Sequence, residues 1–213
     1  MWRTSIVVIL SAIASFAVAR WITHDFQVWT AEGARRLEVA LHPVPAPRVS
    51  MEGPGLRGQT LDRLLSGERA VTLVDFMYTR CVTVCAVLGG TFQQAQASIV
   101  AGERKPGEAP LRLLSISFDP ERDDVGVLRA YAAGLQADPV LWRFARVSSP
   151  VDAQRVLDTY RVTVIDDGLG GYEHNAALLV VDPMGRLVRV FDSAELETAL
   201  SFSRALAAAG TSP

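Results

Sequence analysis

Residues 70–85 read AVTLVDFMYTRCVTVC, and this stretch decides the fold. Its first part, Ala70 to Tyr78, is a nearly continuous apolar run of β-branched and aromatic residues, which is typical of a strand covered on both faces. Two cysteines, Cys81 and Cys85, follow directly. The pattern indicates an α/β domain whose reactive groups lie at the carboxyl end of a buried strand.

Helical and strand patterns alternate after the cysteines. This order predicts a thioredoxin-like fold of the α/β class, with a central mixed sheet flanked by helices. The first two strands must pair in parallel through a right-handed crossover. The expected elements are a helix over residues 82–101, a strand from Leu111 to Phe118, a helix from Asp119 to about Gln136, a helix over 151–160, strands over 176–181 and 187–191, and a helix over 194–209.

Composition limits the class of protein. The chain has 213 residues, of which 49% are hydrophobic and 21% charged, so it is globular rather than disordered. The formal net charge of −2 gives no electrostatic reason to expect a nucleic-acid partner. We expect one thioredoxin-like domain over residues 49–213, which is large enough to bury a full core.

The N-terminus carries an apolar segment from Ser5 to Ala19. As a helix it spans about 22 Å, and the flanking Trp2 and Trp21 extend it toward the thickness of a bilayer. Residues 17–19 (AVA) also fit a signal cleavage site. We interpret residues 1–22 as a membrane anchor or uncleaved signal. It would hold the chain by a single pass in the inner (cytoplasmic) membrane, with the C-terminal domain on the periplasmic side.

Residues 23–48 are interpreted as a stalk or linker. Ala31 to Leu41 has the pattern of a short helix, and the prolines of residues 42–47 (HPVPAP) require an extended backbone. We expect this segment to connect the anchor to the domain.

The two cysteines form a local pair suited to chemistry. Cys85 is expected in the first turn of a helix, where the helix dipole favours thiolate over thiol. A four-residue separation places the Cα atoms about 6 Å apart, which permits either a disulfide or a shared metal. Two thiolates would select copper(I) or zinc as the metal. The alternative is thiol-disulfide exchange, with Cys81 as nucleophile and Cys85 as resolving thiol.

His174 is the candidate third ligand. It follows a polar, glycine-rich stretch, residues 166–173 (DDGLGGYE), and precedes an expected strand. We expect this stretch to be a flexible loop that can swing the imidazole toward a metal. The other two histidines, His24 and His42, lie beside the apolar segment and in the proline-rich stalk.

Three motifs, in this order, resemble the SCO/SenC family. They are Tyr78-Thr79-Arg80-Cys81 with Cys85, then residues 117–123 (SFDPERD), then His174 before residues 179–185 (LVVDPMG). The resemblance covers about residues 45–205. It implies a thioredoxin fold that holds one copper ion per chain on Cys81, Cys85 and His174.

The resemblance also implies a role in assembling the copper centre of cytochrome c oxidase, by copper delivery, by reduction of acceptor cysteines, or by both. The partner would be the copper-receiving subunit of the oxidase or another copper or thiol protein. Asp119 matches a family aspartate near the metal loop, although an aspartate before a proline is also a common helix cap.

The chain departs from the family pattern near its cysteines and histidine. The family usually has proline after each cysteine, whereas Val82 and Ala86 stand here, and Glu173 replaces the usual aspartate before His174. The loop that leads to His174 is also short. Metal affinity and the reduction potential of the cysteines are both expected to shift.

Asp75 favours the redox alternative. It interrupts the apolar strand six residues before Cys81, a position where the sequence resembles thioredoxins. A carboxyl buried beside thiols has a raised pKa and can accept a proton during thiol exchange. Asp75 would then serve a periplasmic thiol-disulfide oxidoreductase. A strand aspartate that reaches solvent or bonds to a neighbouring backbone is the simpler interpretation.

Overall fold

Strand β3 (Val71–Met77) lies inside a seven-stranded mixed sheet whose order is β1-β9-β8-β3-β4-β5-β2. The computed structural model describes residues 2–23, 25–26, 28–56, 58–81, 84–168 and 170–209, without the side chains of residues 3 and 84–86. Strands β3, β4 and β5 run parallel, and the other neighbours pair antiparallel. The remaining strands of this sheet are β1 (Val44–Pro45), β2 (Met51–Glu52), β4 (Leu111–Ser117), β5 (Trp142–Val147), β8 (Ala177–Val181) and β9 (Arg186–Asp192).

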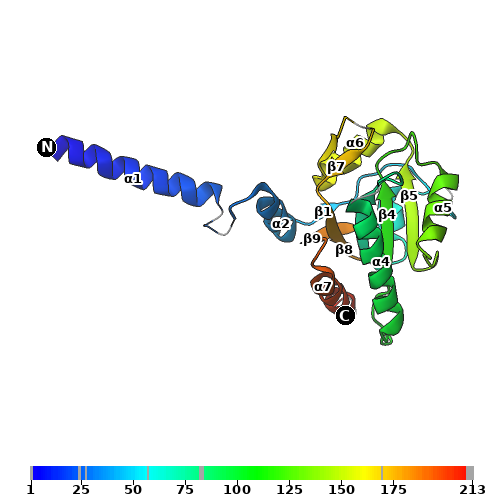
Figure 1. The fold of residues 1–213 in the computed structure, drawn as a ribbon. Helices are drawn as coiled ribbons and strands as arrows, with labels where there is room; N and C mark the ends of the chain where they lie inside the picture. The colour runs from blue at the N-terminus through cyan, green and yellow to red at the C-terminus, as the bar shows by residue number, and fades with distance from the viewer. Residues whose placement is uncertain are drawn as a thin grey trace.

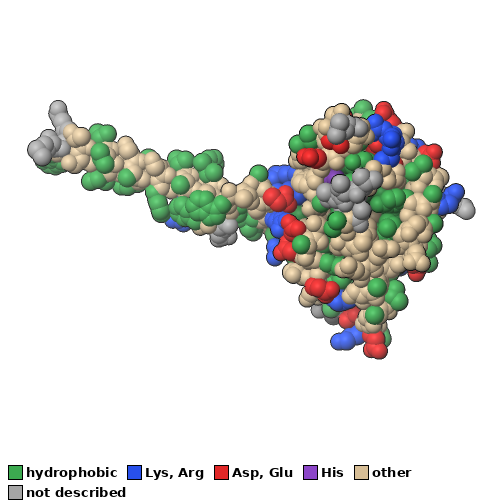
Figure 2. Space-filling view, viewed as in Figure 1, with side chains coloured by type: hydrophobic (Ala, Val, Ile, Leu, Met, Phe, Trp, Pro, Cys, Tyr) green, Lys and Arg blue, Asp and Glu red, His purple; other side chains and the backbone are tan. Residues whose placement is uncertain are grey.

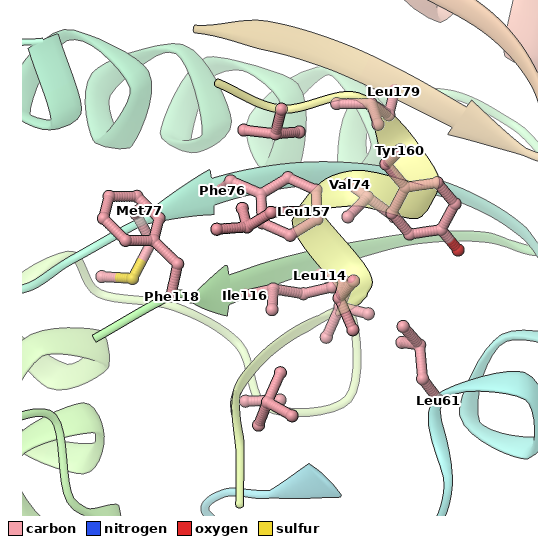
Figure 3. Packing of buried hydrophobic residues seen from close by; sticks show 14 of the residues in the cluster. Leu61, Val74, Phe76, Met77, Leu114, Ile116, Phe118, Leu157, Tyr160 and Leu179 are labelled. Carbon is pink, nitrogen blue, oxygen red and sulfur yellow. The ribbon is translucent and has the colours of Figure 1, made fainter. Parts of the chain in front are cut away.

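Both faces of β3 are buried, as its continuous apolar run predicts. Val71 and Leu73 belong to one core cluster, and Val74 and Phe76 belong to the other. Figure 3 shows the second cluster, in which Phe76 lies with Leu157 and Tyr160 from a helix that covers this face. The alternation of side chains along the strand therefore builds two hydrophobic layers from one segment.

Helices cover both faces of the sheet (Figure 1). Helices α4 (Val84–Ala101), α5 (Val125–Gly134) and α7 (Leu196–Ala209) cover the face of Val71 and Leu73. Helices α3 (Leu61–Ser66) and α6 (Pro150–Tyr160) cover the other face. Because α4 and α5 connect parallel strands on one face, the carboxyl ends of β3 and β4 lie at the same edge of the sheet.

The helix expected from Asp119 begins later than predicted. Residues 120–122 form a turn, and α5 starts at Val125 after Asp124, whose side chain accepts a hydrogen bond from the Val127 amide. Asp124 thus takes the capping position. The interpretation of Asp119 as a helix cap is wrong, and the turn is available to carry functional side chains.

Part of the predicted stalk packs on the domain. The expected helix is present as α2 (Ala31–Leu41), with Val39 in the hydrophobic core, and β1 pairs with β9. The buried Arg35 donates from Nε to the Tyr160 carbonyl at 3.1 Å. Arg36 forms ion pairs with Asp192 and Glu195. Residues 31–45 are therefore docked onto the domain. The sequence does not indicate this docking, because it depends on contacts between residues far apart in the chain.

Helix α1 (Trp2–Ile22) projects away from the domain (Figure 1). Residues Thr4–Ile22 have a mean hydropathy of 2.0, and none of them is buried. Figure 2 shows hydrophobic side chains along this helix and charged side chains where the chain meets the domain. By length and composition α1 is suited to cross a membrane, a property it shares with signal sequences.

The segment before His174 is a hairpin rather than the expected flexible loop. Strand β6 (Val164–Asp166) pairs antiparallel with β7 (Tyr172–His174), and together they form a two-stranded sheet separate from the main one. Val164 pairs with His174 directly. The hairpin lies near α6 at one end of the domain (Figure 1).

Candidate metal and redox site

Cys81 lies in a turn at the carboxyl end of β3. Its amide donates to the Tyr78 carbonyl at 3.3 Å, and the residue is buried, with 7% of its surface exposed. Helix α4 begins at Val84, so the backbone of Cys85 belongs to the first turn of that helix, as expected. The side chain of Cys85 lies outside the described residues. A helix N-terminus favours the thiolate form of a cysteine placed there.

Asp123 joins the cysteine turn to the end of β4. Its carboxylate is fully buried and accepts hydrogen bonds from the Thr79 amide at 3.0 Å, from the Thr79 hydroxyl, and from the Ser117 hydroxyl at 2.6 Å. A buried carboxylate with this number of donors is held in one position. The sequence does not indicate this role for Asp123, because its partner Thr79 is remote along the chain.

Asp119 lies nearby in a different network. It is buried, its amide donates to Ser117 Oγ at 3.1 Å, and its carboxylate accepts from Arg122 at 3.0 Å. Arg122 also donates to the Tyr172 hydroxyl at 3.2 Å, and its guanidinium lies 5.8 Å from the centre of that ring. Asp119 therefore acts on the histidine hairpin through Arg122. It also borders a groove of about 390 Å³ between α6 and the hairpin.

The His174 ring is half-buried and lies against an aromatic group. Its centre is 5.4 Å from that of Phe118, in an edge-on arrangement. Phe118 in turn lies 5.4 Å from Tyr78 and 5.7 Å from Tyr172. Burial lowers the pKa of His174, so the imidazole is neutral at neutral pH and can offer a nitrogen lone pair to a metal.

The hairpin is tied directly to the residue that begins the cysteine turn. The Tyr78 hydroxyl accepts a hydrogen bond from the Tyr172 amide at 2.9 Å and donates to the Tyr172 carbonyl at 3.2 Å. Tyr78 thus contacts both Phe118 and the hairpin. One aromatic group therefore connects the Cys81 turn to the His174 hairpin.

Asp75 is buried, with 2% of its surface exposed. Burial raises its pKa from 3.8 to about 7, against the lowering effect of the neighbouring Ser115 hydroxyl, and its Oδ1 has no hydrogen-bond partner. Ser115 itself accepts from the Trp142 indole at 2.9 Å. By the alternation of β3, Asp75 faces the side covered by α4, the helix that carries Cys85. Of the simpler interpretation, the solvent-reaching aspartate is wrong, whereas a bond to the backbone is not contradicted, because a backbone hydrogen bond also acts to lower the pKa of Asp75.

The available donors fit a soft metal ion. Among the side chains that the structure describes, no three His, Cys, Asp or Glu residues gather into a metal site, and the expected trio includes Cys85, which is outside this set. The two described members are a buried thiol and a neutral imidazole. Sulfur and imidazole nitrogen together suit copper or zinc and not magnesium or calcium.

Comparison with known proteins identifies relatives of the whole domain. A sequence model of the SCO1/SenC family matches residues 62–206. A SCO1 protein homolog of Bacillus subtilis (strain 168) is 26% identical over 133 residues, which are 62% of this chain and 65% of the relative. The chain thus spans slightly less than two thirds of that relative's length.

Solved structures show the same fold. BsSco, described as a Sco-family cytochrome c oxidase assembly protein with a disulfide switch, has a TM-score of 0.65 at 19% identity, over 78% of this chain and 95% of that chain. ScoI of Bradyrhizobium japonicum, with copper bound, has a TM-score of 0.55 at 23% identity, over 76% and 99%. The predicted thioredoxin-like fold is confirmed.

Proposed function

The chain belongs to the SCO1/SenC family, and we propose that it binds one copper ion through Cys81, Cys85 and His174 and serves the assembly of a copper site of cytochrome c oxidase. One observation carries this proposal. Tyr78, at the start of the cysteine turn, packs against Phe118, and Phe118 packs edge-on against His174. Residues from two remote parts of the chain are thereby collected at one edge of the sheet.

Each donor would contribute in a distinct way. Cys81 offers sulfur from a turn fixed by Asp123, and Cys85 offers a thiolate favoured by the N-terminus of α4. His174 offers a neutral nitrogen from a separate hairpin. Copper is the cargo in this scheme. An acceptor protein with its own thiolates can replace these donors one at a time, so that the ion is not released to water.

The N-terminal helix would keep this exchange at a membrane. We propose that α1 is a retained single-pass anchor in the inner membrane and that the domain lies on the periplasmic side. Residues 23–30 connect α1 to α2, and α2 is docked on the domain through Val39 and Arg35. Such a short connection suits an acceptor that is itself membrane-bound, such as the copper-receiving subunit of the oxidase.

The test is an anaerobic copper(I) titration of the full chain in detergent, against a chromogenic copper(I) chelator. We expect one equivalent to bind to the wild type. His174→Ala should lower the affinity by at least about 100-fold, because even changes to residues behind metal ligands cost about 10- to 100-fold. His42→Ala is the matched control, since His42 is an exposed histidine on the chain after α2, and it should bind as the wild type does. Equal affinity in all three proteins would remove His174 from the site.

Thiol-disulfide exchange is the second candidate function, and the burial of Asp75 favours it. In this reaction the Cys81 thiolate attacks a disulfide of the partner and releases one partner thiolate. The Cys85 thiolate then attacks the mixed disulfide, which leaves a Cys81–Cys85 disulfide and a reduced partner. Two electrons pass to the partner. Asp75, on the sheet face that α4 covers, would accept the thiol proton of Cys85.

The same variants separate the two functions. His174→Ala removes a metal donor but neither thiol, so a protein that acts by exchange should reduce a model disulfide at the wild-type rate. A protein that acts by copper delivery should lose copper binding in this variant. A chain that does both would show the two effects independently.

A further inference from the structure

The Tyr78 hydroxyl makes an unusual pair of hydrogen bonds. It accepts from the Tyr172 amide at 2.9 Å and donates to the Tyr172 carbonyl at 3.2 Å, so one side chain pairs with both backbone groups of one strand residue. This is the pattern that a neighbouring strand would provide. Tyr78 therefore replaces a strand at the edge of β7.

The hairpin needs such support. It has two short strands and is separate from the seven-stranded sheet. A two-stranded hairpin is marginally stable by itself in water, so contacts with the rest of the domain must hold it in place. Val164 and Tyr172 pack against the hydrophobic core, and the hairpin also makes specific contacts with Tyr78, Phe118 and Arg122.

Tyr78 differs from the other two supports because it is also part of the cysteine turn. Its carbonyl accepts the Cys81 amide at 3.3 Å, while its hydroxyl holds Tyr172. Tyr172 and His174 are two residues apart on β7 and share one face of that strand. Tyr78 thus links the Cys81 turn directly to the His174 hairpin.

We propose that Tyr78 is a positioning residue that holds the His174 hairpin against the cysteine turn before any metal is bound. The inference deepens the proposed copper function and rests on it for the effect on copper affinity. The two hydrogen bonds between Tyr78 and Tyr172, which we call the Tyr78 latch, are a property of the copper-free protein. Without the hydroxyl, the hairpin keeps its ring contacts with Phe118 but is no longer held in a fixed position relative to the cysteine turn. The imidazole must then be ordered at the time of binding, which lowers affinity.

The test compares Tyr78→Phe with Tyr160→Phe in the full chain. Tyr78→Phe keeps the aromatic ring and removes the hydroxyl alone. Tyr160→Phe removes another buried tyrosine hydroxyl, one that has no hydrogen-bond partner. It therefore controls for loss of a hydroxyl in the same hydrophobic cluster.

The first readout is amide hydrogen exchange in the copper-free protein. Tyr78→Phe should speed exchange at the Tyr172 amide by about 5- to 30-fold, the size expected from one to two net hydrogen bonds. Tyr160→Phe should leave it unchanged. Unchanged exchange at Tyr172 in Tyr78→Phe would overturn the latch, whatever the protein does with copper.

The second readout is copper(I) affinity by chelator competition, together with the thiolate-to-copper(II) absorption band. We expect the affinity to fall by about 5- to 30-fold and the band to shift, while the reduction potential of the cysteine pair stays the same. Faster exchange with wild-type affinity and an unshifted band would overturn the positioning role. A wild type that binds no copper would reject the proposed function, and exchange at Tyr172 would still decide the latch.

Discussion

The Cys81 turn and the His174 hairpin are held by different kinds of interaction. Cys81 follows a strand in which every residue is buried, and the fully buried Asp123 carboxylate fixes its turn. His174 lies on a small separate sheet, which hydrogen bonds, ring contacts and the packing of partly buried side chains attach to the domain. The cysteine side therefore depends on the core of the protein, whereas the histidine side depends on a few local contacts.

In the proposed copper site, this difference would give one donor a fixed position and leave the other able to move. Local openings cost only the contacts that they break, while movement of a central strand costs the global free energy of unfolding. We expect the hairpin to open in the folded protein and the cysteine turn to stay in place. Substitutions near the sheet should then alter the free energy of unfolding, and substitutions at the hairpin should alter only the protection of its amides from hydrogen exchange.

The largest effect is expected from Asp75, on the buried strand. Folding raises its pKa from 3.8 to about 7, so the folded protein holds this proton more tightly than the unfolded chain. The contribution of protonated Asp75 to stability is therefore fully present below about pH 4, is lost as the pH rises from about 4 to about 7, and does not change above that. The free energy of unfolding should drop by as much as about 4 kcal/mol over this window.

Asp75→Asn should remove that pH dependence, because an amide does not ionise. Urea unfolding at pH 4, 5.5 and 7 measures the difference between the two proteins. Parallel pH profiles for wild type and variant would show that Asp75 does not titrate in this range.

A smaller global effect is expected where the sheet meets the cysteine turn. Asp123→Ala leaves the Thr79 amide and the Ser117 hydroxyl without their acceptor, which should cost about 3 kcal/mol of unfolding free energy. Asp124→Ala is the matched neighbour, since it removes a helix cap and should cost about 1 kcal/mol. Chemical denaturation separates the two. Equal costs would mean that the cysteine turn is no more coupled to the core than an exposed helix end.

The sequence predicts the core of this fold well because that information is local. The run from Ala70 to Tyr78 carries its own pattern of two-sided burial, and the structure places β3 at Val71–Met77. Helix α4 and strands β4, β8 and β9 also lie close to their expected positions. Strand β5 (Trp142–Val147) is not among the expected elements, and its aromatic residues Trp142 and Phe144 are buried in the core.

The remaining features depend on contacts between distant residues. The hairpin that carries His174 is polar and rich in glycine, so nothing in its periodicity indicates a strand, and its support comes from Tyr78. The role of Asp123 depends on Thr79, and the docking of α2 depends on the Tyr160 carbonyl. The resemblance to the family supported the candidate ligands that the cysteine spacing and the position of His174 had indicated. It did not indicate which side chains hold them.

The smallest change in stability, and the sharpest test of the comparison, is expected from Arg122→Gln. Arg122 links the buried Asp119 to the Tyr172 hydroxyl, and its own side chain is partly exposed. Solvent weakens such a contact, so the free energy of unfolding should change little. Amide exchange across residues 172–174 should nevertheless become faster, because the hairpin loses one of its attachments while β3 keeps all of its own.

Arg155→Gln, which breaks an exposed ion pair with Asp152 on α6, is the control and should leave the hairpin amides unchanged. If Arg122→Gln instead lowered the denaturation midpoint and left residues 172–174 protected, the hairpin would have to be part of the same cooperative unit as the sheet, and the two sides of the site would move together.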